Sequence, residues 1–477
     1  MALFVYNHKT MRRIIPLSCF CAVISLSFAA KVGSPDQRLK NAYRLPPKNG
    51  WTYVHLEGTP SEIGFQHGWL LYKEIQDGFE VQKLEAEHDL KHPWAFFRDA
   101  GRDMLWPHVP DEYRQELIGI AEGLKARGSA LDIQDVVALN ASMEWSYYTE
   151  QYDKEHGIVK PKTVTAPDHC SAFVATGSYT RDGKVVIAHN NWSSYLDGER
   201  WTYAFDVKPA TGHHFVMDGY PGLIHSADDF GVNDAGIAIT ETTITAFHGW
   251  DSNGVPEFVR ARKAMQYSES IDDFDRIMRA GNNGGYANDW LVADVKTNEV
   301  ASLELGLKNV ELKRSKDGYF TGANFPINEK LLKEETDFNP NDPSASANAR
   351  RARWEELMYK NKGRIDAAMA KAFLADHYDV VSKKTQPSEH TLCGHIDLSP
   401  RGMGDWKAKF EPAGAVQNKV ADAALIQKMT FWAAAGHACG LSFKSAPHLA
   451  AHPEFNWESS LLHDMNAEKW TLVKGPR

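Results

Sequence analysis

The chain has 477 residues, of which 43% are hydrophobic and 11% aromatic, enough apolar material for a large buried core. The formal net charge is -9, from 53 basic and 62 acidic side chains, and no basic run stands out. This composition is typical of a globular protein and argues against nucleic acid as a partner.

The chain begins with the pattern of an export signal, whose start we place at Met11. Two arginines follow Met11, residues 14–28 are apolar, and Ser27-Phe28-Ala29 has the small-x-small pattern of a cleavage site. We therefore expect residues 1–30 to be removed and the mature protein to lie in a periplasm, a lumen or the extracellular medium. The alternative is a membrane anchor, but about 15 apolar residues are short for a span of roughly 20, so we expect no stable membrane span.

Three cysteines remain after removal of the signal: Cys170, Cys393 and Cys439. In an oxidising compartment, three thiols indicate one disulfide and one free thiol. We expect a disulfide between Cys393 and Cys439, which leaves Cys170 free for chemistry. The alternative is that all three are unpaired and pack as small buried hydrophobes.

The first part of the mature chain favours helices. Thr59-Pro60-Ser61-Glu62 is a capping box with proline at the first helical position, so a long helix is expected to follow. A second helix is predicted from Pro110 through Leu124, and Asp132 caps a third. Residues 150–168 are polar, contain two prolines and show little periodicity, which indicates an exposed loop that leads directly to Cys170.

After Cys170 the periodicity changes from helical to strand-like. Residues 171–177 and 184–189 flank the turn Arg181-Asp182-Gly183 and predict a β-hairpin. Further strands are predicted at 201–207, 213–217, 236–245, 289–294 and 300–305, helices at 257–267, 271–279 and 347–374, and a loop-rich C-terminus. Strands and helices in this order indicate an α+β layered fold.

Cys170 is the candidate nucleophile. An ordinary thiol, with a pKa near 8.5, is only a few per cent thiolate at neutral pH and needs a base. If the bond between His169 and Cys170 is broken, the new α-amino group, with a pKa of about 7.7 to 8.0, lies beside the thiol and can take its proton. This is the arrangement of N-terminal nucleophile (Ntn) hydrolases. The alternative is a buried cysteine at the start of a strand, without a chemical role.

Six ordered motifs along the chain show a family resemblance. They are Asp168-His169-Cys170-Ser171-Ala172-Phe173, Ala188-His189-Asn190-Asn191-Trp192, the stretch from Tyr220-Pro221-Gly222 to Asp228-Asp229-Phe230, Glu241-Thr242-Thr243, the run Asn282 to Trp290, and Gly394-His395-Ile396-Asp397-Leu398. Together they resemble the phospholipase B-like family, which is related to the autoproteolytic acyl-coenzyme A:isopenicillin N acyltransferases and, more distantly, to bile salt and penicillin amidases. The resemblance covers most of the mature chain.

The resemblance implies the four-layer αββα sandwich of the Ntn hydrolase superfamily, with an N-terminal helical segment, and autocleavage immediately before Cys170. The expected parts are a signal peptide (1–30), a mainly helical fragment (31–169) that autocleavage releases, and a catalytic fragment (170–477). We expect the two cleaved fragments to stay associated.

The resemblance also suggests further site residues. His189 lies where the second strand of the hairpin would return beside the Cys170 sulfur. It could orient the α-amine, help to protonate the leaving group, or satisfy a buried hydrogen bond. Related amidases have an arginine and an aspartate near this point, so the sequence His189-Asn190-Asn191-Trp192 departs from their pattern.

Two donors to an oxyanion are suggested by the same resemblance. Asn288 matches the family asparagine that stabilises the tetrahedral intermediate, and its alternative is a turn residue. Thr242 is a weaker second donor, or simply a strand residue. Arg350, in the pattern Ser346-x-x-x-Arg350, resembles a helix entry in related amidases that borders the active site, where it would lower the pKa of the thiol. Its alternative is a solvated helix face.

The expected function is a self-processed hydrolase or acyltransferase that acts on amide or acyl-ester bonds. Its substrate would be a small acyl amide or a phospholipid or other ester. The alternatives are an exported non-catalytic binding protein on the same scaffold and a metal-dependent hydrolase. Only His395-Ile396-Asp397 and His437-Ala438-Cys439 suggest metal ligands, and neither spacing makes a zinc site by itself, so we expect no metal and no cofactor.

Overall fold

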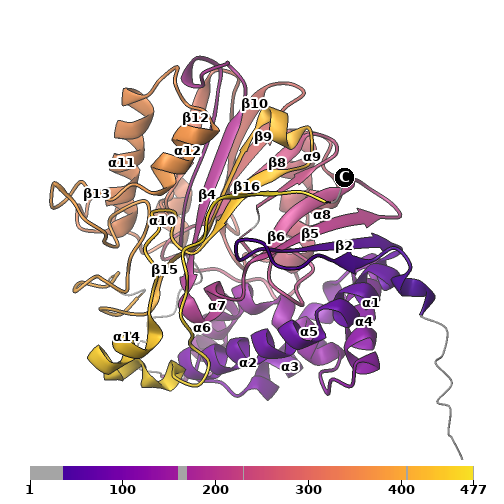
Figure 1. The fold of residues 1–477 in the computed structure, drawn as a ribbon. Helices are drawn as coiled ribbons and strands as arrows, with labels where there is room; N and C mark the ends of the chain where they lie inside the picture. The colour runs from indigo at the N-terminus through magenta and orange to yellow at the C-terminus, as the bar shows by residue number, and fades with distance from the viewer. Residues whose placement is uncertain (1–35, 160–168, 229, 404–406, 476–477) are drawn as a thin grey trace, which may run out of the picture. The chain divides into compact units, whose positions relative to one another are not determined.

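Two β-sheets lie face to face, with helices on their outer sides (Figure 1). The computed structural model describes residues 36–159, 169–228, 230–403 and 407–475, so the predicted signal peptide lies outside the described residues. Residues 37–477 form one compact unit. Within the described ranges, none of the helices has both the length and the apolar character that a membrane crossing requires.

The larger sheet has nine strands in the order β1-β2-β5-β6-β7-β8-β9-β10-β11. Neighbouring strands are antiparallel, except that β2 and β5 are parallel. β1 and β2 precede Cys170, so the N-terminal segment contributes strands as well as helices to the fold. The strands are β1 (Tyr43–Arg44), β2 (Thr52–Gly58), β5 (Tyr203–Pro209), β6 (Phe215–Gly219), β7 (Gly231–Asn233), β8 (Ile237–Thr243), β9 (Asn288–Asp294), β10 (Glu299–Leu305) and β11 (Val310–Ser315).

The smaller sheet has six antiparallel strands in the order β12-β3-β4-β15-β16-β17. β3 and β4 form the predicted hairpin. β15 was not predicted, because its sequence AGAVQNKVAD has few residues with a preference for strands; burial between β4 and β16 places it in the sheet. The strands are β12 (Gly318–Gly322), β3 (His169–Thr176), β4 (Val186–Ser194), β15 (Ala413–Asp422), β16 (Phe431–Ala435) and β17 (Thr471–Val473), beside a separate pair, β13 (Tyr378–Asp379) and β14 (Lys384–Thr385).

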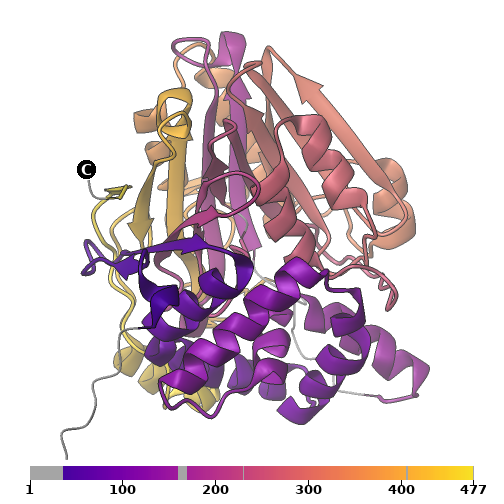
Figure 2. The same ribbon diagram turned by 90° about the vertical axis from the view of Figure 1, so that its right-hand side faces the viewer.

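Within residues 36–159, which the structure describes, six α-helices precede Cys170, and Figure 2 shows the N-terminal helices gathered at one end of the two sheets. The predicted capping box at Thr59 and the predicted cap at Asp132 are confirmed, and Asp132 also forms a capping box with Asp135. The predicted loop 150–168 is wrong in its first part, because α6 continues to Glu155, and residues 160–168 lie outside the described residues. The helices are α1 (Pro60–Leu70), α2 (Tyr72–Asp89), α3 (Trp94–Ala100), α4 (Asp111–Ala126), α5 (Ile133–Asn140) and α6 (Trp145–Glu155).

After Cys170, the predicted helices 257–267 and 271–279 are confirmed as α8 and α9, whereas α7, α10, α13 and α14 were not predicted. The predicted helix 347–374 is two helices, separated at Gly363, whose φ of +75° lies in the left-handed region. The helices after Cys170 are α7 (Tyr195–Gly198), α8 (Glu257–Tyr267), α9 (Ile271–Arg279), α10 (Glu329–Glu335), α11 (Ser346–Lys360), α12 (Ala367–Leu374), α13 (Ala423–Ile426) and α14 (Ser445–Ala451).

Three hydrophobic cores separate four layers. Helices α1, α8 and α9 pack on the outer face of the larger sheet, and α4 packs against α1. Small and branched residues from both sheets, such as Ala172 and Leu291, fill the space between them. Helices α11 and α12 cover the outer face of the smaller sheet, where Phe173 contacts Trp354 and Phe373. The predicted α+β fold is therefore confirmed, with its layers in the order αββα.

Candidate active site around Cys170

Cys170 is the second residue of β3, and its side chain is fully buried between the two sheets. It shares a strand face with Ala172 and Val174, which belong to the core between the sheets. The Cys170 Sγ lies 3.9 Å from Asn191 Oδ1, on the neighbouring strand, and 3.9 Å from Glu241 Oε1, on the opposite sheet. The sulfur therefore lies between an amide oxygen and a carboxylate.

His189 lies on β4, on the same face as Asn191. The register pairs it with Ala172 rather than with Cys170, so it is a diagonal neighbour of the sulfur. A ring nitrogen of His189, a carboxylate oxygen of Glu241 and Cys170 Sγ all lie within 4.8 Å of one another. Burial, with the nearby charge of Lys419, lowers the pKa of His189 well below its ordinary value. The imidazole is therefore neutral in the physiological range.

A buried ion-pair network lies behind His189. Lys419 Nζ lies 2.8 Å from Asp218 and also pairs with Asp228, whose carboxylate is 3.7 Å from His189 Nδ1. Ser226 donates hydrogen bonds to both aspartates, at 2.6 and 2.7 Å. Burial opposes the charge of Lys419, but the two carboxylates outweigh this effect and raise the pKa of Lys419. Burial and the neighbouring Asp218 raise the pKa of Asp228. These ion pairs and hydrogen bonds fix the position of the Asp228 carboxylate, which lies beside the His189 ring.

The backbone of Cys170 is held at both of its polar atoms. Its nitrogen donates to Asn324 Oδ1 at 3.1 Å, and its carbonyl oxygen accepts from Arg350 Nη1 at 2.5 Å. Asn324 Nδ2 in turn donates to the carbonyl oxygen of Thr243 at 2.8 Å. The position of the candidate nucleophile is therefore fixed from outside its own strand.

Arg350 is completely buried, so its interpretation as part of a solvated helix face is wrong. Its guanidinium donates to Ser171 Oγ at 3.1 Å, to Asn324 Oδ1 at 2.9 Å and to Ser346 Oγ at 2.9 Å. It also lies 4.3 Å above the ring of Trp192. Burial lowers the pKa of Arg350 to about 9.

Asn288 is the first residue of β9 rather than a turn residue, and it pairs with Thr243 of β8. Its side chain is fully buried, and neither amide atom has a hydrogen-bond partner among the described residues. The hydroxyl of Thr242 likewise has no partner in this part of the chain. A Cβ on Gly322 of β12 would lie 2.4 Å from Thr242 Oγ1, so this hydroxyl faces the smaller sheet. Buried polar groups without partners are candidates for contacts with a ligand.

A cavity of about 420 Å³ adjoins the site. Asn324 and Arg350, the two residues that hold the Cys170 backbone, contribute to its wall. The volume lies within the range of small-molecule sites, roughly 300 to 1,000 Å³. The remaining lining is mixed in polarity and comes from Thr245, Ala246, Asp337, Phe338, Asn339, Asp342, Ser344, Ala345, Ser346, Ala347, Glu389, Arg401, Gly402 and Met403.

Some residues at this site were not predicted. Asn191 and Glu241 lie inside motifs that carry the family resemblance, so these motifs could have identified them. Asn324 has no such signal: it follows strand β12 and reaches Cys170 only through the fold. The predicted cleavage site at His169 borders residues 160–168, which lie outside the described ranges.

Cys393 and Cys439 are both free thiols in the structure, so the predicted disulfide is not present. The fold does bring the two together, with sulfur atoms within 4.8 Å of each other. His377 and His395 belong to the same group. Their nitrogens, together with the two thiols, could serve as ligands, so the thiols can lie close together for a reason other than a disulfide.

Comparisons with known proteins give one family. A family model described as phospholipase B matches residues 95–471. The chain is similar to an uncharacterized protein of Archaeoglobus fulgidus, with 26% identity over 298 residues, which cover 61% of this chain and 49% of that protein. It is 26% identical over 159 residues to phospholipase B-like protein A of Dictyostelium discoideum, covering 29% of this chain and 27% of that protein. The chain therefore spans about half the length of these relatives, or less.

Among solved structures, the chain is similar to a mutant of conjugated bile acid hydrolase from Clostridium perfringens. The match has a TM-score of 0.32 and 10% sequence identity, and covers 55% of this chain and 88% of that chain. A TM-score this low adds nothing to the argument from the four layers and from the geometry around Cys170.

Proposed function

The chain belongs to the phospholipase B family, and from this premise we propose that it is an exported, self-processed hydrolase or acyltransferase with Cys170 as N-terminal nucleophile. Family membership supports a hydrolase. The observation that supports the thiol mechanism is the setting of Cys170: a buried sulfur beside polar oxygens, with its backbone nitrogen bound to Asn324 and its carbonyl bound to Arg350, next to a cavity.

Self-cleavage begins with attack of Cys170 Sγ on the carbonyl carbon of His169. No α-amine exists at that stage, so another group must accept the thiol proton, and Glu241 Oε1, 3.9 Å from the sulfur, is the acceptor that we propose. The C–S bond forms, the C–N bond breaks, and the departing nitrogen takes up a proton to become the α-amine. Water then hydrolyses the thioester, which leaves a carboxylate on His169 and regenerates the thiol.

The nitrogen that becomes the α-amine already donates to Asn324 Oδ1 at 3.1 Å. This contact would hold the amine beside the sulfur after the cut. In turnover the amine takes the thiol proton and the thiolate attacks the acyl carbonyl of the substrate. The ammonium then returns the proton to the leaving amine or alcohol, and water or another acceptor removes the acyl group from Cys170.

The tetrahedral intermediate requires hydrogen-bond donors. We assign the amide of Asn288 to this task, because it is buried and has no hydrogen-bond partner among the described residues, and Thr242 is the second donor. His189, which is neutral, orients the groups at the sulfur, and Arg350 fixes the Cys170 carbonyl.

The cavity supports a small acyl substrate with a polar group. Phe338 and Met403 give its wall apolar surface, while Arg401, Glu389 and Asp337 give it charge. The family name suggests phospholipid acyl esters, and amides fit the same chemistry, so both classes belong in the first substrate screen.

The test is the intact mass and N-terminal sequence of the mature protein beside a Cys170→Ala variant. The wild type should yield a fragment that begins at Cys170, and the variant should stay whole. Ser268→Ala is a suitable control, because it removes one buried hydroxyl without a hydrogen-bond partner among the described residues and should be cleaved normally. A wild type that stays whole yet is active would overturn self-processing.

Two outcomes separate the alternatives. Activity that survives Cys170→Ala and is lost on chelation indicates a metal-dependent hydrolase. The other outcome is that the protein, cleaved or not, binds acyl compounds while Cys170 stays fully reactive toward a thiol reagent. This outcome indicates a binding protein, because turnover through Cys170 requires an acyl-enzyme that would block the thiol.

A further inference from the structure

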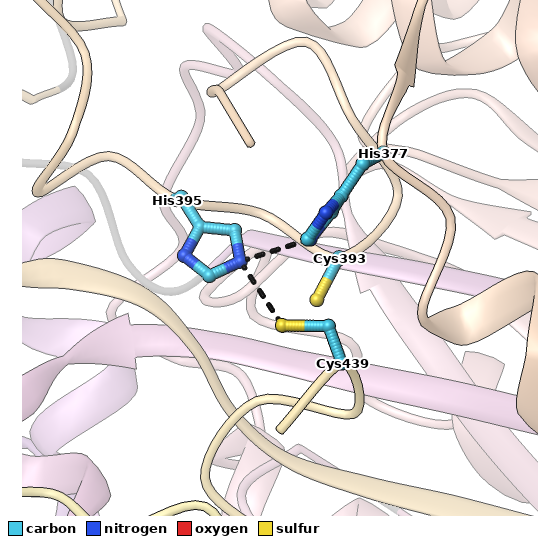
Figure 3. A group of neighbouring side chains, drawn as sticks. All are labelled: His377, Cys393, His395 and Cys439. Carbon is cyan, nitrogen blue, oxygen red and sulfur yellow. Dashed lines mark hydrogen bonds between the residues drawn. The ribbon is translucent and has the colours of Figure 1, made fainter. Parts of the chain in front are cut away.

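Four side chains that can bind metals converge in a group that does not include Cys170: His377, Cys393, His395 and Cys439 (Figure 3). His377 lies between α12 and β13, Cys393 and His395 lie between β14 and β15, and Cys439 follows β16. Their ligand atoms all lie within 4.8 Å of one another. The tertiary fold, rather than a local motif, makes this cysteine–histidine group.

The spacing of the ligand atoms fits a tetrahedral ion. His377 Nε2 lies 3.2 Å from His395 Nε2, and His395 Nε2 lies 3.6 Å from Cys439 Sγ. Zinc bonds of about 2.0–2.1 Å to nitrogen and 2.3 Å to sulfur put two tetrahedral nitrogens about 3.3 Å apart, and a nitrogen and a sulfur about 3.6 Å apart. One tetrahedral centre therefore satisfies both measured distances.

The chemistry of the ligands also selects the metal. All four ligand atoms are nitrogen or sulfur, a set that favours zinc over magnesium or calcium. Two thiolates and a divalent cation give a site without net charge, which suits a place where Cys393 and His395 are buried and His377 and Cys439 are half-buried. We propose that the cysteine–histidine group binds a structural Zn²⁺ ion.

The surroundings support this assignment. The backbone N–H of Leu441 donates to Cys439 Sγ at 3.4 Å, a contact that favours a thiolate ligand. Asp397 Oδ1 lies 3.9 Å from His395 Nδ1, the ring nitrogen other than the one that faces Cys439, and Tyr195 donates to this carboxylate at 2.8 Å. At 3.9 Å the carboxylate of Asp397 is not hydrogen-bonded to His395, but it places a negative charge behind that imidazole, the side from which outer partners act on zinc ligands.

A second group shares His395 and adds Asp397 and His437. The rings of His395 and His437 are stacked, with centroids 3.9 Å apart and planes at 18°. The lone pairs of stacked rings run side by side instead of converging, and Tyr195 already contacts both Asp397 and His437. The sulfur-containing group is therefore the better fit to a single ion.

The zinc site would fix one wall of the cavity beside Cys170. Glu389 and Arg401, which line that cavity and pair with each other at 2.6 Å, flank Cys393 and His395 along the chain. The ion takes no part in the chemistry proposed for Cys170. The zinc proposal therefore holds whether or not the chain cleaves itself.

The first experiment measures metal content by elemental analysis and native mass spectrometry on mature protein purified without a histidine tag or chelator. We expect about one zinc per chain in the wild type and in Cys170→Ala, which leaves all four ligands in place. In Cys439→Ser and in His377→Ala, the zinc content per chain should fall by about tenfold or more under the same conditions. Zinc that is retained in both ligand variants would overturn the proposal.

A second measurement needs no variant and so does not depend on whether the variants fold. Cobalt exchanged into the wild type should show the intense visible bands of a tetrahedral ion and a sulfur-to-cobalt charge-transfer band, and folded protein without them contradicts the site. Non-reducing peptide mapping distinguishes the remaining possibility. A Cys393–Cys439 disulfide in zinc-free wild type would show that the two thiols exist to pair with each other.

Discussion

Among the described residues, cysteine sulfur lies close to imidazole at two places, the buried surroundings of Cys170 and the partly buried cysteine–histidine group, and their neighbours differ. Around Cys170, oxygens of Asn191 and Glu241 each lie 3.9 Å from the sulfur, and the backbone is fixed by an amide and a guanidinium. Around Cys393 and Cys439, the group of potential metal ligands among the described residues consists of the two thiols and the nitrogens of His377 and His395. The chemical type of the neighbouring atoms therefore separates a thiol that is a candidate nucleophile from thiols that are candidate metal ligands.

The largest expected effects separate the two places completely. Cys170→Ala should abolish cleavage and lower kcat/KM by on the order of 10³-fold or more, because the nucleophile is lost, while zinc content stays unchanged. Cys439→Ser should do the reverse, losing zinc while cleavage before Cys170 proceeds. Gel analysis, kinetics and metal analysis of both variants check this pair. Loss of zinc in Cys170→Ala would contradict this separation, because it would mean that Cys170 takes part in zinc binding.

The next effect concerns the oxyanion. Asn288→Ala should lower kcat by about 10² to 10³-fold with little change in KM, because it removes a donor that acts on the transition state. Thr242→Val should cost less. Steady-state kinetics with the best acyl substrate check this order, and an unchanged kcat in Asn288→Ala would return that residue to a structural role.

A smaller effect tests the guanidinium that distinguishes the Cys170 site. Arg350→Lys keeps the charge but loses the forked contacts with the Cys170 carbonyl and Asn324, and should slow self-cleavage by about 10 to 100-fold. Arg351→Lys, on the half-exposed side of the same helix, is the matched control and should cleave at the wild-type rate. The half-life of the precursor, followed by gel, measures both. Equal half-lives would contradict the role of Arg350.

Removal of zinc should have a modest effect on catalysis and a clear one on stability. Chelation should lower Tm by about 5 to 10 °C, since the ion ties three segments together. KM should rise more than kcat falls, because Glu389 and Arg401 lie in the affected wall. Thermal unfolding and kinetics before and after dialysis against a chelator, with zinc re-addition as control, check this. A kcat that falls to zero while KM is unchanged would place the metal in the chemistry instead.

The smallest effect is a pH dependence. His189 has a lowered pKa, so below about pH 6.5 the unfolded state binds a proton that the folded state does not, and the free energy of unfolding falls as the pH falls. His189→Asn should remove up to about 1.4 kcal/mol per pH unit of this slope. Denaturant unfolding from pH 7 to pH 5 in a Cys170→Ala background measures it. An unchanged slope would mean that His189 binds its proton equally in the folded and unfolded states, which contradicts the lowered pKa.

Much of the fold was predictable from local signals. The capping box at Thr59, the cap at Asp132, the β3–β4 hairpin, α8 and α9 follow from capping and turn residues and periodicity that agree with the final structure. β15 did not follow, because alanine, glycine and polar residues form a strand there only under the influence of its neighbours β4 and β16. Tertiary burial, which no local window contains, decides such cases.

The candidate site also has one part that could be predicted from the sequence and another that depends on the tertiary fold. Cys170 and His189 lie on one hairpin, so sequence spacing and the motifs could place them together. Asn324 meets Cys170 across 154 positions, and His377 meets Cys439 only after three segments fold onto one another. The prediction that Cys393 and Cys439 lie side by side was right. The histidine nitrogens that lie beside them could not be predicted from the short motifs around either cysteine.

The parallel pairing of β2 with β5 has a consequence for how the mature protein denatures. β2 belongs to the segment before Cys170 and β5 to the segment after it. If the chain is cut before Cys170, as proposed, the two strands belong to separate polypeptides, so loss of their pairing on heating becomes dissociation and its recovery becomes a second-order association. Cleaved protein should therefore resist denaturation through a slow unfolding rate and fail to renature on cooling at low concentration, while uncut precursor recovers.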